Sequence, residues 1–159
     1  MYKALVIANT FLRKARFENN GIRPMSLNYL CYLAYSYYAA YNNYPLFNED
    51  ILVSRYGPRI MEIYEEFRPI GECRILRYAE ITCDENPFID IHDTNTNEVL
   101  NFVWKKYKYY TPIKLATECN NDTSLWYKLN NEQKFVFSFE DVRDFYSKLI
   151  IKNEDDIND

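Results

Sequence analysis

The sequence predicts a mainly α protein: a compact single-domain helical bundle with a small β-hairpin or short strands. Its length of 159 residues suits one domain, and its 48 % apolar residues are enough to form a substantial core. In most segments the apolar residues recur at helical spacing, and prolines stand where helices are expected to begin. We expect the domain to span residues 1–151 and residues 152–159 to form an acidic, disordered tail.

Two long helices are expected in the N-terminal part. The first covers residues 3–18, although Asn9 and Thr10 interrupt its apolar run. The second covers residues 24–42, because Pro24 suits the first helical position, where its missing N–H would have no partner in any case. This second helix carries apolar or aromatic residues on both faces. It is therefore either buried centrally or covers the core with one face and a partner with the other.

The stretch SRYGPRIMEIYEEF, residues 54–67, places the most permissive backbone residue beside the most restrictive one. Gly57 is expected to end an extended or turn segment, because a residue that precedes proline avoids α geometry. Pro58 is then expected to open a new helix, so that the pair forms a sharp corner. The weaker pattern CRILRYAEI, residues 73–81, predicts a short strand or one arm of a hairpin.

Three further helix starts are expected in the C-terminal half. Asn95 followed by Glu98 resembles a capping box. Thr111 and Pro112 combine a capping side chain with a proline in the first helical position. Ser138 is expected to cap the last helix, whose apolar residues again fall on one side.

Composition narrows the range of partners. The net charge is −4, and lysine and arginine are scattered rather than gathered into the basic stripe that nucleic-acid binding requires, so a nucleic-acid partner is not expected. No segment approaches the roughly 20 consecutive apolar residues of a membrane-spanning helix, so no membrane partner is expected either. A cytoplasmic location follows as the default expectation.

The cysteines do not suggest a disulfide framework or a metal centre. Cys31, Cys73, Cys83 and Cys119 lie far apart, which predicts four reduced thiols that are mostly buried. A zinc site using Cys73, Cys83 and the only histidine, His92, is the alternative. Structural zinc ligands normally come in closely spaced pairs, and these residues do not. Neither a metal nor another cofactor is expected.

Catalytic motifs are absent from the sequence. None of the common nucleophile, phosphate-binding or metalloprotease patterns occurs, and a single histidine leaves few acid–base relays. A non-enzymatic protein is therefore the main hypothesis. A metal-dependent enzyme around Asp90, His92 and Asp93 is kept as an alternative, although an acidic loop with one histidine is more often only solvated.

Tyrosine is unusually frequent, with 16 residues in a chain that is 18 % aromatic. An AT-rich genome explains part of this excess as well as any structural role does. A tyrosine combines a large apolar body with a polar tip, which serves both a core and a surface that binds another protein. Plain core packing is the preferred interpretation for Trp104.

An ordered set of residues resembles the phage-associated protein family that contains the SocA antitoxin, also called the Panacea domain. The resemblance covers residues 1–150 and consists of a proline-initiated helix, a Pro-Leu-Phe connector, a Tyr-Gly-Pro corner and a second block. The matching residues are Pro24, Leu27, Leu30, Tyr32, Pro45, Leu46, Phe47, Tyr56, Gly57, Pro58, Tyr64, Leu100, Val103, Trp104, Tyr107, Leu115, Thr117 and Trp126.

The chain also departs from the family pattern. Two family lysines are replaced by Ser26 and Tyr29, the cap threonine by Arg23, and the valine after the Tyr-Gly-Pro corner by Arg59. The family's Ala-Trp before the corner becomes Val53-Ser54, and Cys119 stands where a histidine is usual. These changes affect the surface more than the core, so they bear on which partner is bound.

The resemblance implies a non-enzymatic antitoxin of a toxin–antitoxin system, which binds and neutralises a partner toxin; SocA also delivers its toxin to a protease. The alternative is a phage- or mobile-element-encoded inhibitor that binds a host defence protein. Tyr56, Gly57, Pro58 and Tyr64 are expected to form the structural corner of the family motif. The residues expected to contact the protein partner are Tyr29, Tyr32, Arg59 and Trp126.

Overall fold

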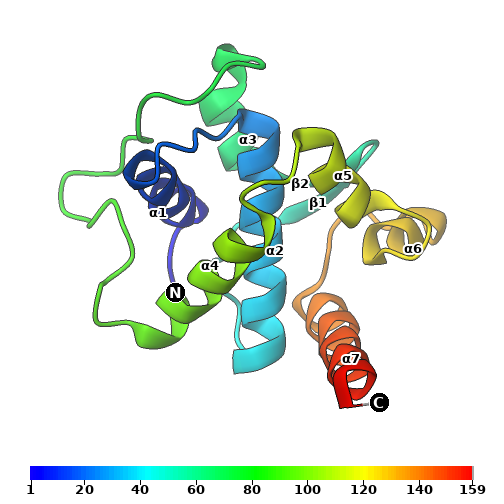
Figure 1. Ribbon diagram of the computed structural model, residues 1–159. Coiled ribbons are helices and arrows are strands. Elements are labelled where there is room, and N and C mark those ends of the chain that lie inside the picture. Colours follow the sequence, from blue (N-terminus) through cyan, green and yellow to red (C-terminus); the bar gives the residue numbers. More distant parts are fainter. Residues whose placement is uncertain (159) are drawn as a thin grey trace.

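A computed structural model describes residues 1–158 of the chain, with side chains described up to residue 156. It confirms the mainly α fold, because most of the described elements are helices and the strands form one small antiparallel sheet (Figure 1). The elements, in chain order, are α1 (Ala4–Phe17), α2 (Pro24–Asn42), β1 (Ile51–Ser54), β2 (Gly57–Ile60), α3 (Met61–Phe67), the 3₁₀ helix η1 (Arg68–Ile70), α4 (Thr94–Tyr107), α5 (Pro112–Asn120), α6 (Leu125–Asn131) and α7 (Phe139–Asn158).

Helix α2 runs through the middle of the molecule (Figure 1). It contacts α1, α3, α4, α5, α7 and strand β2, and it is buried on opposite faces of its length. Of the two alternatives for its apolar and aromatic faces, central burial is therefore confirmed. Its bounds agree with those expected from the sequence, and Pro24 lies in its first turn without a side-chain cap from Arg23.

A cluster of buried tyrosines joins α2 to α4 and α7. The hydroxyl oxygens of Tyr37 and Tyr107 lie 3.3 Å apart, and the Tyr146 hydroxyl donates to that of Tyr32 at 3.4 Å. The rings of Tyr32 and Tyr146 meet edge to face, with centroids 6.2 Å apart. Burial raises the pKa of the Tyr32, Tyr107 and Tyr146 phenols above its usual value, so that these hydroxyls stay neutral.

This cluster corrects one expectation from the sequence. Tyr32 was a candidate for the partner-binding surface, but its side chain is only 1 % exposed. A helical wheel shows which residues share a face, yet it cannot show that a later helix covers that face, as α7 covers this one. Tyr32 therefore belongs to the core.

The predicted caps of α5 and α7 are confirmed. The Thr111 hydroxyl accepts the Lys114 N–H at 3.1 Å, and the Ser138 hydroxyl accepts the Asp141 N–H at 3.1 Å, as expected. Helix α4 begins slightly earlier than the sequence suggested. Its cap is Asp93, whose carboxylate accepts the Thr96 N–H at 3.1 Å, rather than Asn95.

The small β element lies in a different place from the one expected. Strands β1 and β2 pair in register from Ile51 opposite Ile60 to Ser54 opposite Gly57. Residues 73–81 contain no strand. Pro58 lies within β2 and does not open a helix, because helix α3 begins only at Met61. The Gly-Pro pair is a corner, as predicted, but it belongs to a hairpin that leads into α3.

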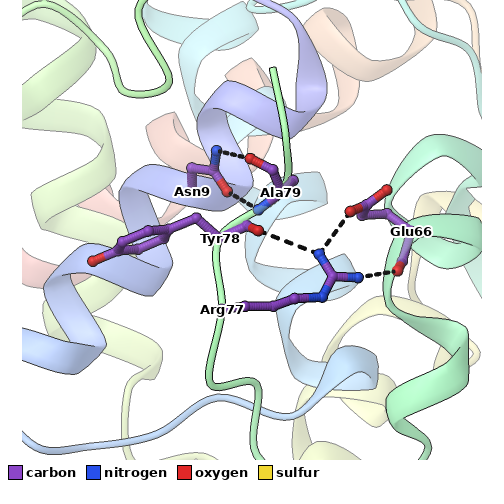
Figure 2. A network of polar contacts seen from close by, with 5 residues as sticks. All are labelled: Asn9, Glu66, Arg77, Tyr78 and Ala79. Atoms are coloured by element: carbon purple, nitrogen blue, oxygen red, sulfur yellow. Dashed lines mark hydrogen bonds and ion pairs between the residues drawn. The ribbon is translucent and has the colours of Figure 1, made fainter. Parts of the chain in front are cut away.

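Residues 71–93 form a long irregular connection that passes beside α1. The Asn9 amide accepts the Ala79 N–H at 2.7 Å and donates to the Ala79 carbonyl at 3.0 Å (Figure 2). The Thr10 hydroxyl accepts the Ile89 N–H at 3.1 Å. The two polar residues that interrupt the apolar run of α1 are thus buried partners of backbone groups that would otherwise lack them.

A salt bridge ties the same connection to α3. The Arg77 guanidinium donates to the Glu66 carboxylate at 2.7 Å and to the Glu66 carbonyl at 2.9 Å, and it also donates to the Tyr78 carbonyl at 3.2 Å (Figure 2). With the contacts of Asn9 and Thr10, these bonds hold a segment without regular structure against two helices.

The end of the chain also differs from the expectation. Helix α7 continues to Asn158, so residues 152–158, predicted to be a disordered tail, are helical, while Asp159 lies outside the described residues. The buried Tyr146 and the half-buried Leu149 and Ile150 anchor the preceding turns. Extending an existing helix requires much less ordering than starting one, which accounts for the continuation. Over residues 1–158 no helix is long and apolar enough to cross a membrane.

Replacing a buried tyrosine tests this core. We expect Tyr32→Ala to lower the free energy of unfolding by about 3–5 kcal/mol, because truncating a buried aromatic ring leaves a cavity. Tyr109→Ala, which removes a ring that is 82 % exposed, should change it by less than about 0.5 kcal/mol. Urea unfolding followed by circular dichroism measures both values. Equal losses in the two variants would contradict the burial of Tyr32.

Alkaline pH should weaken the fold through Tyr35. Burial, reinforced by the carboxylates of Glu140 and Asp50, raises the pKa of Tyr35 to about 12. The unfolded phenol loses its proton near pH 10, so between pH ~10 and ~12 the unfolded state binds fewer protons and stability falls with rising pH. The loss should reach on the order of 2–3 kcal/mol by pH ~12. Unfolding free energies measured across this range should fall less steeply for Tyr35→Phe.

Candidate functional site

The hairpin is held by side chains from three helices. On the outer edge of β2, the Asn28 amide donates to the Pro58 carbonyl at 2.9 Å and accepts the Ile60 N–H at 2.9 Å. This α2 side chain therefore occupies the position that the backbone of a neighbouring strand would take. An exposed strand edge is prone to pairing with other chains, and Asn28 closes this one.

The tip of the hairpin is fixed in the same way. The Tyr56 carbonyl accepts from the Asn120 amide at 2.8 Å and from the Tyr29 hydroxyl at 3.2 Å. The Trp126 indole N–H donates to the Ser54 carbonyl at 2.7 Å. At least one side chain from each of the helices α2, α5 and α6 thus hydrogen-bonds to the backbone of the hairpin, whose strands are four residues long. These bonds make the hairpin a rigid platform.

Gly57 is required at the end of this turn. Its φ of +132° is a backbone conformation that other residues rarely adopt. A Cβ at this position would lie 3.3 Å from the Tyr29 hydroxyl oxygen and 3.5 Å from the Asn120 Cβ, the same two side chains that hold the Tyr56 carbonyl. The missing side chain therefore lets the turn approach α2 and α5 closely.

A cavity of about 310 Å³ opens between the hairpin, the first turns of α2, and α3 with η1. We call it the hairpin pocket. Tyrosine, proline, methionine and arginine make up most of its wall. Its lining residues are Pro24, Met25, Asn28, Tyr29, Ser54, Tyr56, Pro58, Arg59, Tyr64, Arg68, Gly71 and Glu72.

Two arginines flank the tyrosine of α3 within this pocket. The Cζ atom of Arg59 lies over the Tyr64 ring, 4.2 Å from its centroid, and that of Arg68 lies 5.8 Å from the same centroid. Arg59 and Tyr64 are half-buried, whereas Arg68 is exposed. Stacking on an aromatic face orients a guanidinium group and leaves its N–H edges free to bind.

The hairpin pocket brings together most of the residues singled out by the sequence. Tyr56, Pro58 and Tyr64 of the corner motif line it, and so do Tyr29 and Arg59 of the expected partner-binding set. Tyr29 is only 5 % exposed and holds the Tyr56 carbonyl, so it supports the pocket rather than offering a contact surface. Gly57 is buried and is not among the residues that line the pocket. Trp126 is half-buried and supports the hairpin from its far side. Tyr32 is absent from the pocket because it lies in the core.

Several residues that line the pocket or hold its hairpin were not predicted from the sequence. Arg68 follows Tyr64 by one helical turn, a spacing that places both on one face, and this signal could have been used. Asn28 and Asn120 gave no comparable signal. They act on backbone groups that are distant in the sequence, and an isolated asparagine carries no indication of its partner.

The two hydroxyl groups of the pocket at Tyr29 and Ser54 are already hydrogen-bonded within the protein. The Tyr29 hydroxyl is engaged by the Tyr56 carbonyl, and burial raises its pKa above the usual value. The Ser54 hydroxyl donates to the Gly57 carbonyl at 2.6 Å, so it is not poised as a nucleophile. Among the described lining residues Glu72 is the one carboxylate. The arrangement offers arginine donors and aromatic surface to an incoming group.

The residues proposed for metal alternatives have other roles. The Asp93 carboxylate caps α4 and also accepts the Tyr2 hydroxyl at 2.7 Å, and the Asp90 carboxylate accepts the His92 N–H at 2.9 Å. Cys73 and Cys83 are exposed free thiols. Within the described part of the chain, no three histidine, cysteine, aspartate or glutamate side chains are grouped so that they could hold a metal ion.

The remaining cysteines and Trp104 lie in the core. Cys31 and Cys119 are buried, whereas Cys73 and Cys83 are exposed, so only half of the cysteines are buried rather than most of them. Trp104 is buried too, as predicted, and its indole N–H donates to the Glu18 carboxylate, which also pairs with Lys108 at 2.8 Å.

No protein-family model, curated protein or solved structure matches this chain. The resemblance to the SocA family therefore rests only on the residues that match its pattern.

A substitution at the turn tests how the platform is built. We expect Gly57→Ala to lower the free energy of unfolding by about 1–3 kcal/mol, because alanine is strained at this φ and its Cβ crowds Tyr29. Gly71→Ala is the matched control, since Gly71 also has a positive φ but no neighbour within 4 Å of an added Cβ. Thermal unfolding should show the larger loss at Gly57. A larger loss at Gly71 would contradict the close packing of the turn.

Proposed function

We propose that this protein is a non-enzymatic module that binds another protein through the hairpin pocket. The observation that carries the proposal is the rigid, tyrosine- and arginine-rich rim around a small apolar cavity. Tyrosine and arginine are enriched among the residues that dominate protein–protein binding energy, and such residues act best on a backbone that does not rearrange. The Tyr56 side chain is 64 % exposed although its own backbone is held by two hydrogen bonds.

The family resemblance supports a more specific role. In a SocA-like antitoxin the bound protein is a toxin encoded beside it, which becomes harmless in the complex. The Tyr-Gly-Pro corner that carries this resemblance forms the tip of the hairpin and one wall of the pocket. We therefore propose an antitoxin whose corner motif both shapes the fold and positions the contact residues, acting with or without delivery of the toxin to a protease.

Co-expression with the product of the adjacent gene tests this role. The neighbouring protein should arrest growth when it is produced alone and should be tolerated with the present chain. Tyr56→Ala should abolish this protection and weaken the complex at least roughly 30-fold, as expected for truncating a central contact residue. Tyr44→Ala is the control, because that ring is 51 % exposed and lies outside the pocket.

The result also separates the two candidate partners. A neighbouring protein that is harmless, together with a host defence protein that co-purifies with the wild type and not with Tyr56→Ala, would replace the antitoxin by an inhibitor of host defence. Binding that is unchanged in Tyr56→Ala would remove the hairpin pocket from either role.

A further inference from the structure

The hairpin pocket contains two guanidinium groups that have no hydrogen-bond or ion-pair partner in the part of the chain that the structure describes. Neither Arg59 nor Arg68 forms an ion pair or a side-chain hydrogen bond there, whereas Arg77 pairs with Glu66 and Arg143 with Asp144. A guanidinium group has five N–H donors and no acceptor. The half-buried Arg59 in particular keeps its donors unused at the edge of an apolar cavity.

The geometry of these two arginines favours a planar anion. Their Cζ atoms lie 4.2 Å and 5.8 Å from the centroid of the same Tyr64 ring, and within the described residues no hydrogen bond or ion pair occupies their N–H edges. A guanidinium edge matches the two oxygens of a carboxylate, and such charge-assisted pairs are about twice as strong as neutral hydrogen bonds. The two arginines outnumber the one carboxylate in the described lining of the pocket. The charge of the site is therefore opposite in sign to the net charge of the whole chain, which is −4.

The rest of the wall favours an apolar group next to that anion. Met25 and Tyr56 are 50 % and 64 % exposed beside the cavity, and Pro24 adds further apolar surface. The volume of about 310 Å³ lies at the lower end of the ~300–1,000 Å³ typical of ligand sites, which suits one or two side chains of a polypeptide. Glu72, the one carboxylate in the described lining, pairs with neither arginine and disfavours a second negative charge at its own end.

We propose that the hairpin pocket recognises an acidic segment of the partner protein, with an aspartate or glutamate carboxylate bound by Arg59 and Arg68 and an adjacent apolar or aromatic side chain packed against Met25 and Tyr56. This inference rests on the proposed function and adds the chemistry of the partner. The two arginines supply the charge complementarity, and the exposed apolar wall requires the second side chain.

A random peptide library displayed on phage, selected against the intact protein, tests the inference. Selected peptides should be enriched in aspartate or glutamate next to phenylalanine, leucine, methionine or tyrosine. The double variant Arg59→Glu/Arg68→Glu should instead select lysine or arginine at the charged position. A synthetic acidic peptide from the first selection should bind the double variant Arg59→Gln/Arg68→Gln at least roughly tenfold more weakly than the wild type.

Matched controls exist elsewhere on the surface. Arg13 lies over Phe88 at 4.1 Å and Arg16 over Tyr78 at 5.9 Å, which reproduces the two stacking distances of the pocket outside it. Arg13→Glu/Arg16→Glu should leave the selected peptides acidic. Circular dichroism and thermal unfolding of every variant establish that the fold is retained, and the glutamine variant removes the positive charges without introducing negative ones should the glutamates disturb β2 or η1.

Three outcomes distinguish this inference from the proposed function. Acidic peptides that change sign with the arginine reversal support both. Peptides that lose binding in Tyr56→Ala but carry no acidic residue overturn the acidic segment and leave the protein-binding pocket standing. Peptides whose binding is unaffected by Tyr56→Ala and by both arginine variants overturn the pocket as a protein-binding site.

Discussion

The burial of α2 on opposite faces is the constraint on which the other elements depend. A helix of 19 residues with aromatic side chains on both sides cannot lie at the surface without exposing a large apolar area, so the chain must surround it. Helices α1, α3, α4, α5 and α7 and strand β2 all contact it. The site is a product of this arrangement, because Asn28 and Tyr29 reach the hairpin from the same helix that organises the core.

Asparagine side chains replace missing backbone partners at several places, and three of these hold irregular segments or the hairpin. Asn9 pairs with residue Ala79 of the irregular connection, Asn28 with the free edge of β2, and Asn120 with the hairpin tip. An amide carries a donor and an acceptor in one plane, as a peptide group does, so it can satisfy N–H and C=O groups that no strand reaches. These side-chain hydrogen bonds fix irregular segments against the helices of a small protein. Those of Asn28 and Asn120 also fix the hairpin that forms one wall of the pocket.

The sequence predicted what depends on neighbouring residues. Pro24, Thr111 and Ser138 mark helix starts through contacts within one turn, and these starts agree with the structure. The hairpin was misplaced because Gly57-Pro58 signals a change of direction without specifying strand or helix. Tyr32 was misassigned because its covering helix lies more than a hundred residues further along the chain. Five of the candidate site residues nevertheless line one pocket, since Tyr56, Pro58, Arg59 and Tyr64 are close in sequence and Tyr29 faces them from α2.

The bonds that clamp the hairpin span long stretches of the chain. Asn120 is 64 residues from the carbonyl it binds, and Trp126 is 72 residues from its own. Contacts between such distant residues form late, because the closure entropy of the intervening loop must be overcome first. A polypeptide that ends before α5 therefore lacks two of the clamps, because Asn120 and Trp126 both follow that point. The shape of the hairpin pocket is in this way coupled to two helices, α5 and α6, that lie far along the sequence from the hairpin itself.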